Sequence, residues 1–201
     1  MPKEPDMTRR DFFRGKIFRP IQEAARRGAA AGNAVARRDL SLSLLQRPPG
    51  AVAEGQFLAS CTRCGDCVTA CPPRAIRWAP PEAGEKRAGT PYIDAIRQPC
   101  VMCTDTPCIA ACKPGVLRAE LPPTMATARI DAIACLAWRG QPCRLCVDQC
   151  PVEGAISVDS EQRPIIDPAR CTGCGVCVQV CPAPRNAVDH RPLASRPFWH
   201  G

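Results

Sequence analysis

The chain has 201 residues, a formal net charge of +8, sixteen cysteines and only nine aromatic residues. So few aromatic residues exclude a large aromatic core, and the 23 prolines exclude long uninterrupted helices. No stretch is apolar for long enough to span a membrane. Cysteine at this density indicates disulfides, zinc or iron–sulfur clusters.

Residues 1–50 contain no cysteine and are predicted to be a basic N-terminal arm and linker. From Arg9 to Arg38 there are nine basic and two acidic residues, so most of the net charge lies in this arm. Apolar and small residues recur at helical spacing from Ile17 to Gly28, which predicts a basic amphipathic helix. The sequence Arg47-Pro48-Pro49-Gly50 is typical of a linker.

The segment Thr8-Arg9-Arg10-Asp11-Phe12-Phe13-Arg14 resembles a twin-arginine export motif. An export signal also needs an apolar region after the arginines, but charged residues follow here, from Lys16 to Arg27. We therefore expect a cytoplasmic protein, with peripheral membrane contact through the arm as one option. A periplasmic protein exported by the twin-arginine route is the alternative.

From Phe57 onward the chain repeats a cysteine-rich unit four times, with first cysteines spaced by 35 to 39 residues. A short apolar segment and an aspartate precede three of the units, and a short apolar pair follows each one. This pattern predicts a short strand, a cysteine loop, a short helix, a proline turn and another short strand. The preceding segments end at Asp94, Asp131 and Asp167, and the following pairs are Ala75-Ile76, Val116-Leu117, Ala155-Ile156 and Ala187-Val188.

The four cysteine runs together use every cysteine in the chain. The first and fourth runs have the spacing Cys-x2-Cys-x2-Cys-x3-Cys-Pro of bacterial ferredoxins, whereas the second and third contain extra residues. In chain order the runs are Cys61, Cys64, Cys67, Cys71; Cys100, Cys103, Cys108, Cys112; Cys135, Cys143, Cys146, Cys150; and Cys171, Cys174, Cys177, Cys181.

This spacing has a chemical reason. Three thiolates in one tight loop can ligate three irons of a 4Fe–4S cluster, and Gly65, Gly173 and Gly175 let the backbone approach it. The fourth cysteine lies about one helical turn further on and reaches a neighbouring cluster. Disulfide scaffolds do not group their cysteines in this way, and structural zinc sites use separated pairs or histidine. We therefore predict four 4Fe–4S clusters, which replace the missing apolar core.

The clusters change the charge of the protein. Each oxidised 4Fe–4S cluster with four thiolates carries about −2, so four clusters offset the net charge of the chain. The high isoelectric point is therefore weak evidence for nucleic-acid binding, and the scarcity of aromatic residues argues against it.

The motifs resemble the MauM/NapG family of ferredoxin-type proteins, with an N-terminus similar to NapF-type proteins. The resemblance rests on Arg47-Pro48-Pro49-Gly50, on Gly89-Thr90-Pro91-Tyr92, on Pro99-Cys100 with Pro107-Cys108, and on Cys135-Leu136-Ala137-Trp138 with Cys143. It covers about residues 47–190. It implies electron transfer from a membrane quinol dehydrogenase towards a terminal oxidoreductase, and four 4Fe–4S clusters.

The leading hypothesis is thus an electron carrier, or an electron-transfer subunit, rather than an enzyme. The cluster region has no phosphate-binding loop and no catalytic histidine constellation, and Asp66, Asp105 and Asp148 are interpreted as solvated carboxylates. Trp78, Trp138 and Tyr92 are interpreted as packing residues. The alternative is an accessory or maturation factor that binds a partner oxidoreductase through the basic arm; nucleic-acid binding ranks third.

Two pairings of the runs are compatible with the spacing. Sequential pairing joins the first run with the second and the third with the fourth; nested pairing joins the two regular outer runs and the two expanded inner runs. We predict nested pairing, because each pair then consists of two runs with the same kind of spacing, regular or expanded. The resemblance to multi-cluster electron-transfer subunits favours the same pairing. The predicted ligand sets are Cys61, Cys64, Cys67 with Cys181; Cys171, Cys174, Cys177 with Cys71; Cys100, Cys103, Cys108 with Cys150; and Cys135, Cys143, Cys146 with Cys112.

The expected fold is α+β, with two units like bacterial ferredoxins and a core dominated by clusters. The four-cluster region spans residues 51–192, and residues 193–201 form a tail. Nested pairing predicts an outer unit of about residues 56–80 with 163–190, and an inner unit of about residues 90–160.

Overall fold

The computed structural model describes residues 44–200, which belong to one compact unit that begins near residue 42. The predicted amphipathic helix and the twin-arginine motif lie outside the described residues. The helices and strands in the described part are α3 (Glu54–Ser60), α4 (Asp66–Thr69), β1 (Ile76–Trp78), the 3-10 helix η1 (Pro81–Ala83), β2 (Pro91–Ile93), α5 (Pro107–Ala110), β3 (Ala126–Ile130), the 3-10 helix η2 (Ala137–Arg139), α6 (Leu145–Asp148), β4 (Ile156–Val158), β5 (Pro164–Ile166), α7 (Val176–Gln179) and β6 (Val188–Pro192).

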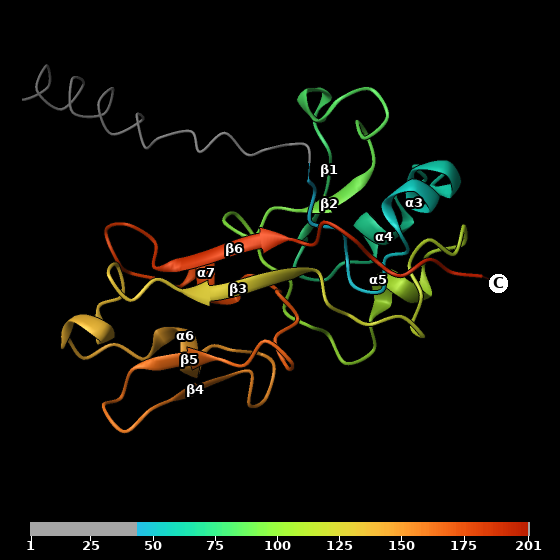
Figure 1. The fold of residues 1–201 in the computed structure, drawn as a ribbon. Coiled ribbons are helices and arrows are strands. Elements are labelled where there is room, and N and C mark those ends of the chain that lie inside the picture. The colour runs from blue at the N-terminus through green and yellow to red at the C-terminus, as the bar shows by residue number, and fades with distance from the viewer. Residues whose placement is uncertain (1–43, 201) are drawn as a thin grey trace, which may run out of the picture. The chain divides into compact units, whose positions relative to one another are not determined.

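The strands form three antiparallel pairs, as shown in Figure 1. Strand β1 pairs with β2, β4 pairs with β5, and β3 pairs with β6. A single β-bridge joins Ala51, which precedes β1 in the sequence, to Leu117, which follows β2. In the same way, β3 precedes β4, β6 follows β5, and β3 pairs with β6. Residues 44–121, here called the first half, therefore repeat the strand order of residues 122–192, the second half.

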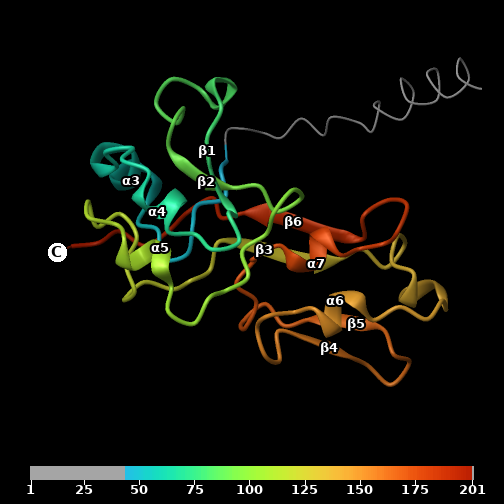
Figure 2. The same ribbon diagram turned by 180° about the vertical axis from the view of Figure 1, so that it is seen from behind.

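Each cysteine loop leads into one turn of helix. Helices α4, α5, α6 and α7 each have four residues and carry the third cysteine of their run. Helix α4 packs against α5, and α6 packs against α7, and both groups can be followed in Figures 1 and 2. Gly65 and Gly175 precede α4 and α7 with φ angles of 86° and 93°, a region that a side chain would strain.

The aspartates that precede three of the runs form one repeated turn. Asp94, Asp131 and Asp167 each accept a hydrogen bond from the backbone N–H two residues later, at 3.2, 3.0 and 2.8 Å. Such a side chain satisfies the backbone where the strand ends and the loop begins. The aspartates thus orient the entry into each cysteine loop.

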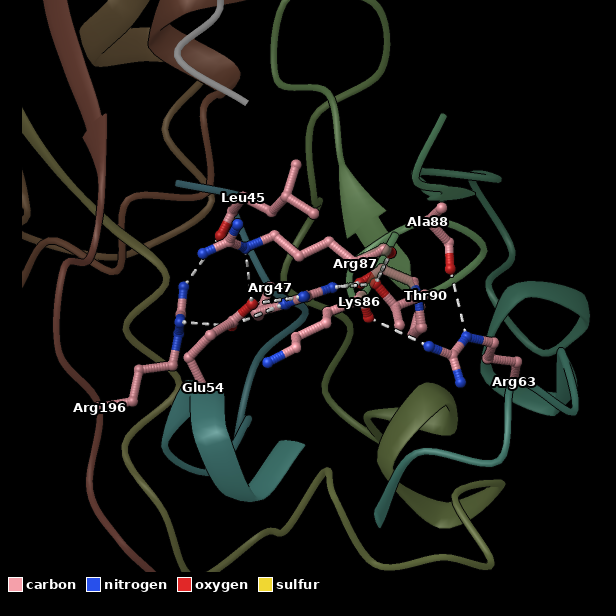
Figure 3. Close-up of polar contacts among 10 residues, drawn as sticks. Leu45, Arg47, Glu54, Arg63, Lys86, Arg87, Ala88, Thr90 and Arg196 are labelled. Atoms are coloured by element: carbon pink, nitrogen blue, oxygen red, sulfur yellow. Dashed lines mark hydrogen bonds and ion pairs between the residues drawn. The ribbon is translucent and has the colours of Figure 1, made fainter. Parts of the chain in front are cut away.

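The predicted linker is buried, which corrects the sequence-based interpretation. Residues 45–50 are all buried, and the Arg47 side chain is completely covered. Arg47 donates to Glu54 at 2.9 and 2.6 Å and to Thr90 at 2.8 Å (Figure 3). Its guanidinium lies 4.5 Å from the ring centre of Phe57. Prolines and glycine here fix a buried turn rather than a flexible connection, because the side chains of Gln46 and Arg47 and the carbonyls of Gln46 and Gly50 all find partners.

Glu54 forms ion pairs with more than one arginine. Arg196 lies 3.4 Å from its carboxylate, and Arg87 lies 3.6 Å from it (Figure 3). Three arginines therefore meet at one carboxylate. Although burial alone would raise the pKa of Glu54, the hydrogen bond and positive charges of the arginines hold that pKa below its usual value of 4.5.

The C-terminal tail returns to the first half. The Ala53 amide donates to the Pro197 carbonyl at 2.8 Å, and Gln56 and Trp199 exchange two hydrogen bonds, at 2.9 and 3.0 Å. The Trp199 ring lies 4.6 Å from the Arg118 guanidinium. Residues 193–200 are thus a clasp on helix α3, not a free extension of β6.

The predicted outer and inner units are wrong in their membership. Strand and helix contacts join the first run with the second and the third run with the fourth. The prediction failed because similar cysteine spacing does not decide which neighbours a short strand can reach. Among residues 44–200, no helix has the length and hydropathy that a membrane span requires.

Candidate metal centres

All sixteen cysteines lie in the described part of the chain, and each has a free thiol. Six of them are buried, and all but one of the others are half-buried; Cys64 is exposed. The disulfide alternative thus finds no support in this structure.

One cavity gathers four cysteines in the first half. Cys71 from the first run lines it together with Cys100, Cys103 and Cys108 from the second run. The rest of the wall is mostly apolar and includes Pro49, Ile76 and Ile93. The buried linker therefore closes one side of this thiol-lined cavity.

A second cavity has the same construction in the second half. Cys181 from the fourth run lines it together with Cys135, Cys143 and Cys146 from the third run. Ile130, Leu136, Pro164 and Val188 are among the apolar wall residues.

The remaining eight cysteines form two further groups, and mutual electrostatics identifies them. Burial, together with negative charge on Cys112, Cys61 and Cys64, raises the pKa of Cys67 to about 12. Burial likewise raises the pKa of Cys177 to about 12, with contributions from its neighbours Cys174, Cys171, Cys146 and Cys150.

The structure therefore defines four ligand sets, which we number. Their members are Cys61, Cys64, Cys67 and Cys112 in set 1; Cys100, Cys103, Cys108 and Cys71 in set 2; Cys135, Cys143, Cys146 and Cys181 in set 3; and Cys171, Cys174, Cys177 and Cys150 in set 4.

The nested pairing is wrong in its fourth members. Nesting places Cys71 with the fourth run, Cys112 with the third, Cys150 with the second and Cys181 with the first. In the structure each fourth cysteine instead joins the adjacent run. The reason is the strand pairing, since β1 with β2 and β4 with β5 bring adjacent runs together. Every other predicted member of each set keeps its place.

Backbone N–H groups point at several sulfurs. The amide of Ala75 donates to Cys71 at 3.3 Å, Gly173 donates to Cys171 at 3.4 Å, and Ala187 donates to Cys181 at 3.4 Å. Hydrogen bonds to ligand sulfur stabilise the thiolate and tune the potential of an iron–sulfur cluster. These loops can thus hold negative sulfur in an otherwise apolar wall.

The residues present fit a cluster of several irons better than a single ion. Among the described residues, no three cysteine, histidine or acidic side chains converge closely enough to hold one metal ion. A four-iron cube instead requires four thiolates spread around its corners, with no histidine or carboxylate. The two cysteine-lined cavities each present four thiols and no histidine or carboxylate, which is the donor set that such a cluster takes.

Two residues that contact a cysteine loop were not predicted from the sequence. Gln46 donates to the Gly173 carbonyl at 3.1 Å, and His190 Nε2 lies 3.0 Å from the same oxygen. Burial lowers the pKa of His190, which favours its neutral form. Because Gly173 lies inside the fourth run, both side chains fix the loop of set 4. No sequence motif indicates either residue.

The remaining candidate residues have structural roles. Asp66 and Asp148 form surface ion pairs with Lys113 and Arg144, and Asp105 is exposed. Tyr92 packs against the small cluster formed by Leu45, Ala79 and Ala83. The aromatic side chains serve as packing as well: Trp138 donates to the Pro164 carbonyl at 3.2 Å under the Arg163 guanidinium, and Trp78 covers Gly65.

Comparison with known proteins agrees with this geometry. The family model "4Fe-4S dicluster domain" matches residues 60–116 and 141–184. No solved structure shows a significant match.

Similar curated proteins carry ferredoxin-type names. The chain is 36% identical over 178 residues to the methylamine utilization ferredoxin-type protein MauM of Methylobacillus flagellatus, covering 80% of this chain and 74% of that protein. It is 36% identical over 165 residues to the ferredoxin-type protein NapG of Escherichia coli K12, covering 74% and 71% of the two chains. It is 33% identical over 158 residues to the ferredoxin-type protein NapF of Haemophilus influenzae, covering 73% and 79%.

The dicluster match, the cysteine-lined cavities and these identities agree on an iron–sulfur protein that carries electrons and is not an enzyme. The chain belongs to the MauM/NapG family of ferredoxin-type 4Fe–4S proteins.

Proposed function

We propose that this protein binds four 4Fe–4S clusters, one in each ligand set, and relays electrons between two redox proteins. Each half then acts as a dicluster unit, with two sets that exchange their fourth cysteines. The observation that carries the proposal is the convergence of Cys71 with the second run and of Cys181 with the third run. When bound, a 4Fe–4S cluster accepts and donates one electron.

The chain supplies the environment of the clusters. Apolar walls exclude water, and backbone N–H groups stabilise thiolate sulfur at Cys71, Cys171 and Cys181. Because each cluster would join cysteines from two different runs, ligand binding and closure of the fold are coupled. The protein without any clusters should therefore be largely unfolded.

The proposed donor is a membrane quinol dehydrogenase or a similar protein, and the proposed acceptor is a terminal oxidoreductase. One relative carries the words "methylamine utilization" in its name, which suggests a dehydrogenase system as one setting. The basic residues between Arg9 and Arg38 would provide electrostatic contact with an acidic partner or an anionic membrane surface. We propose a cytoplasmic site of action, with the periplasm after twin-arginine export as the alternative.

The test is anaerobic purification followed by iron and sulfide analysis and rapid kinetics. We expect about sixteen irons per chain, from four clusters of four. Stopped-flow absorbance should then show reduction by the quinol-dehydrogenase partner and reoxidation by the terminal enzyme. A protein that binds its partner enzyme but is neither reduced nor reoxidised in turnover would instead be a maturation factor.

A further inference from the structure

The loops of set 2 and set 4 touch each other across the two halves. The Cys100 amide donates to the Cys174 carbonyl at 3.2 Å. Cys100 belongs to set 2 and Cys174 to set 4, so this bond joins two ligand residues of different sets. It is a direct link from the first half to the second.

The surrounding contacts hold these two loops closely together. Gly175 has a φ of 93°, and a Cβ at this position would lie 2.3 Å from the Cβ of Ala95. Gln179 donates to the Arg97 carbonyl at 3.1 Å, on the same two segments. The Gly175 backbone therefore approaches the Ala95 methyl group more closely than a side chain at position 175 would allow.

The junction also lies among buried apolar residues. Cys174 is 7% exposed and belongs to the same buried apolar cluster as Cys67, Cys71 and Cys108 of the first half. Pro99 beside Cys100 is fully buried. An apolar bridge of this kind excludes water between the two loops.

In the described part of the chain, the loops of sets 1 and 3 make no such hydrogen bond between the halves. Within residues 44–200, no hydrogen bond joins residues 61–67 to the second half, and none joins residues 135–146 to the first half. Within each half the sets are neighbours, because negative charge on Cys108 contributes to the raised pKa of Cys67, and charge on Cys146 to that of Cys177.

We infer that the four clusters form a single line in the order set 1, set 2, set 4, set 3, and that electrons cross between the halves at the contact of Cys100 with Cys174. This rests on the proposed function and adds to it the order and the two ends. One electron leaves the reduced cluster of set 2 and enters the oxidised cluster of set 4, and no bond or proton is exchanged. Partners would then dock near sets 1 and 3.

The first test uses two variants of the full chain that each keep two clusters. One removes sets 1 and 3 by Cys64→Ala, Cys67→Ala, Cys143→Ala and Cys146→Ala; the other removes sets 2 and 4 by Cys100→Ala, Cys103→Ala, Cys171→Ala and Cys174→Ala. Each should retain about eight irons. Electron paramagnetic resonance is recorded after reduction with dithionite.

Reduced clusters broaden each other's signals when they are close. We expect broadened, interacting signals from the protein that keeps sets 2 and 4, and two independent signals from the protein that keeps sets 1 and 3. The reverse result, or no interaction between sets 2 and 4 at the expected iron content, overturns the order. Wild-type protein with far fewer than sixteen irons would instead overturn the proposed function.

A second test keeps all sixteen cysteines, in case a two-cluster variant fails to fold. Gly175→Ala should separate the loops and reduce the broadening between halves, and adding Ala95→Gly should restore it by removing the clash. Gly65→Ala is the matched control, since Gly65 has a φ of 86° at the same position of the first run but faces only the Trp78 side chain. Unchanged signals in Gly175→Ala at full iron content would contradict the junction.

Discussion

The Arg47 guanidinium donates to both carboxylate oxygens of Glu54, at 2.9 and 2.6 Å, although the Arg47 side chain has no exposed surface. This ion pair connects the buried turn of residues 45–50 with helix α3, which begins at Glu54. A buried arginine with a single carboxylate partner depends strongly on that partner.

Glu54→Gln should therefore destabilise the protein at neutral pH. The substitution leaves three arginines without a counter-charge, and we expect a loss of about 2 kcal/mol, less than for a fully buried pair because Glu54 retains some exposure. Urea unfolding under anaerobic conditions measures it. Glu82→Gln, at an exposed position of η1, is the control and should change little.

The effect of Glu54→Gln should depend on pH in one direction. Because the arginines hold the folded pKa of Glu54 below 4.5, its contribution is present above that value and is lost as pH falls through the folded pKa. The stability difference between wild type and Glu54→Gln should be constant from neutral pH down to about 5 and shrink below 4.5. A difference that grew on acidification would contradict the ion pair.

The C-terminal clasp should contribute measurable stability. Trp199→Ala removes the stack on Arg118, and we expect a loss of about 1–2 kcal/mol with no loss of iron. Its neighbour Phe198 is 58% exposed, so Phe198→Ala is a matched aromatic control and should be nearly neutral. Equal effects of the two substitutions in urea unfolding would argue against the clasp.

The pairing of the runs can be read from iron content. Cys71 and Cys103 belong to the same set, so Cys71→Ala with Cys103→Ala should remove one cluster and leave about twelve irons. Cys71 and Cys174 belong to different sets, so Cys71→Ala with Cys174→Ala should remove two clusters and leave about eight irons. Nested pairing gives the opposite result for both double variants.

Cluster assembly should release protons. Burial raises the pKa of Cys100 to about 12 and that of Cys108 to about 11, so these thiols are protonated at pH 7 when no metal is bound. Because iron binds thiolate, each ligand loses its proton on assembly, and higher pH should favour reconstitution. A weakly buffered reconstitution with a pH indicator measures this; assembly independent of pH between 7 and 9 would contradict it.

The cysteine units were predictable because their chemistry is local. The spacing predicted the loops and one-turn helices, and the apolar segments at Ile93, Ile130 and Ile166 predicted strands that the structure contains. The role of Asp131 and its counterparts was not predicted, although the residue itself was noticed, because a side-chain turn gives no periodic signal.

The longer-range arrangement was less predictable. Run spacing could not decide between nested and sequential pairing, because both bring four thiolates together; the pairing of Arg77 with Tyr92 across β1 and β2 decides it. Arg47-Pro48-Pro49-Gly50 reads as a linker locally, and only its contact with Glu54 and Thr90 shows that it is core. Contacts between residues far apart in sequence carry this information.

The clasp also orders events during protein synthesis. Arg196 reaches Glu54 across 142 positions of the chain, and Trp199 reaches Gln56 across 143. Residues near position 196 leave the ribosome after every cysteine has been made. The first half to emerge is therefore the last to be completed, and its contacts with the C-terminal clasp form only after translation has passed all four runs.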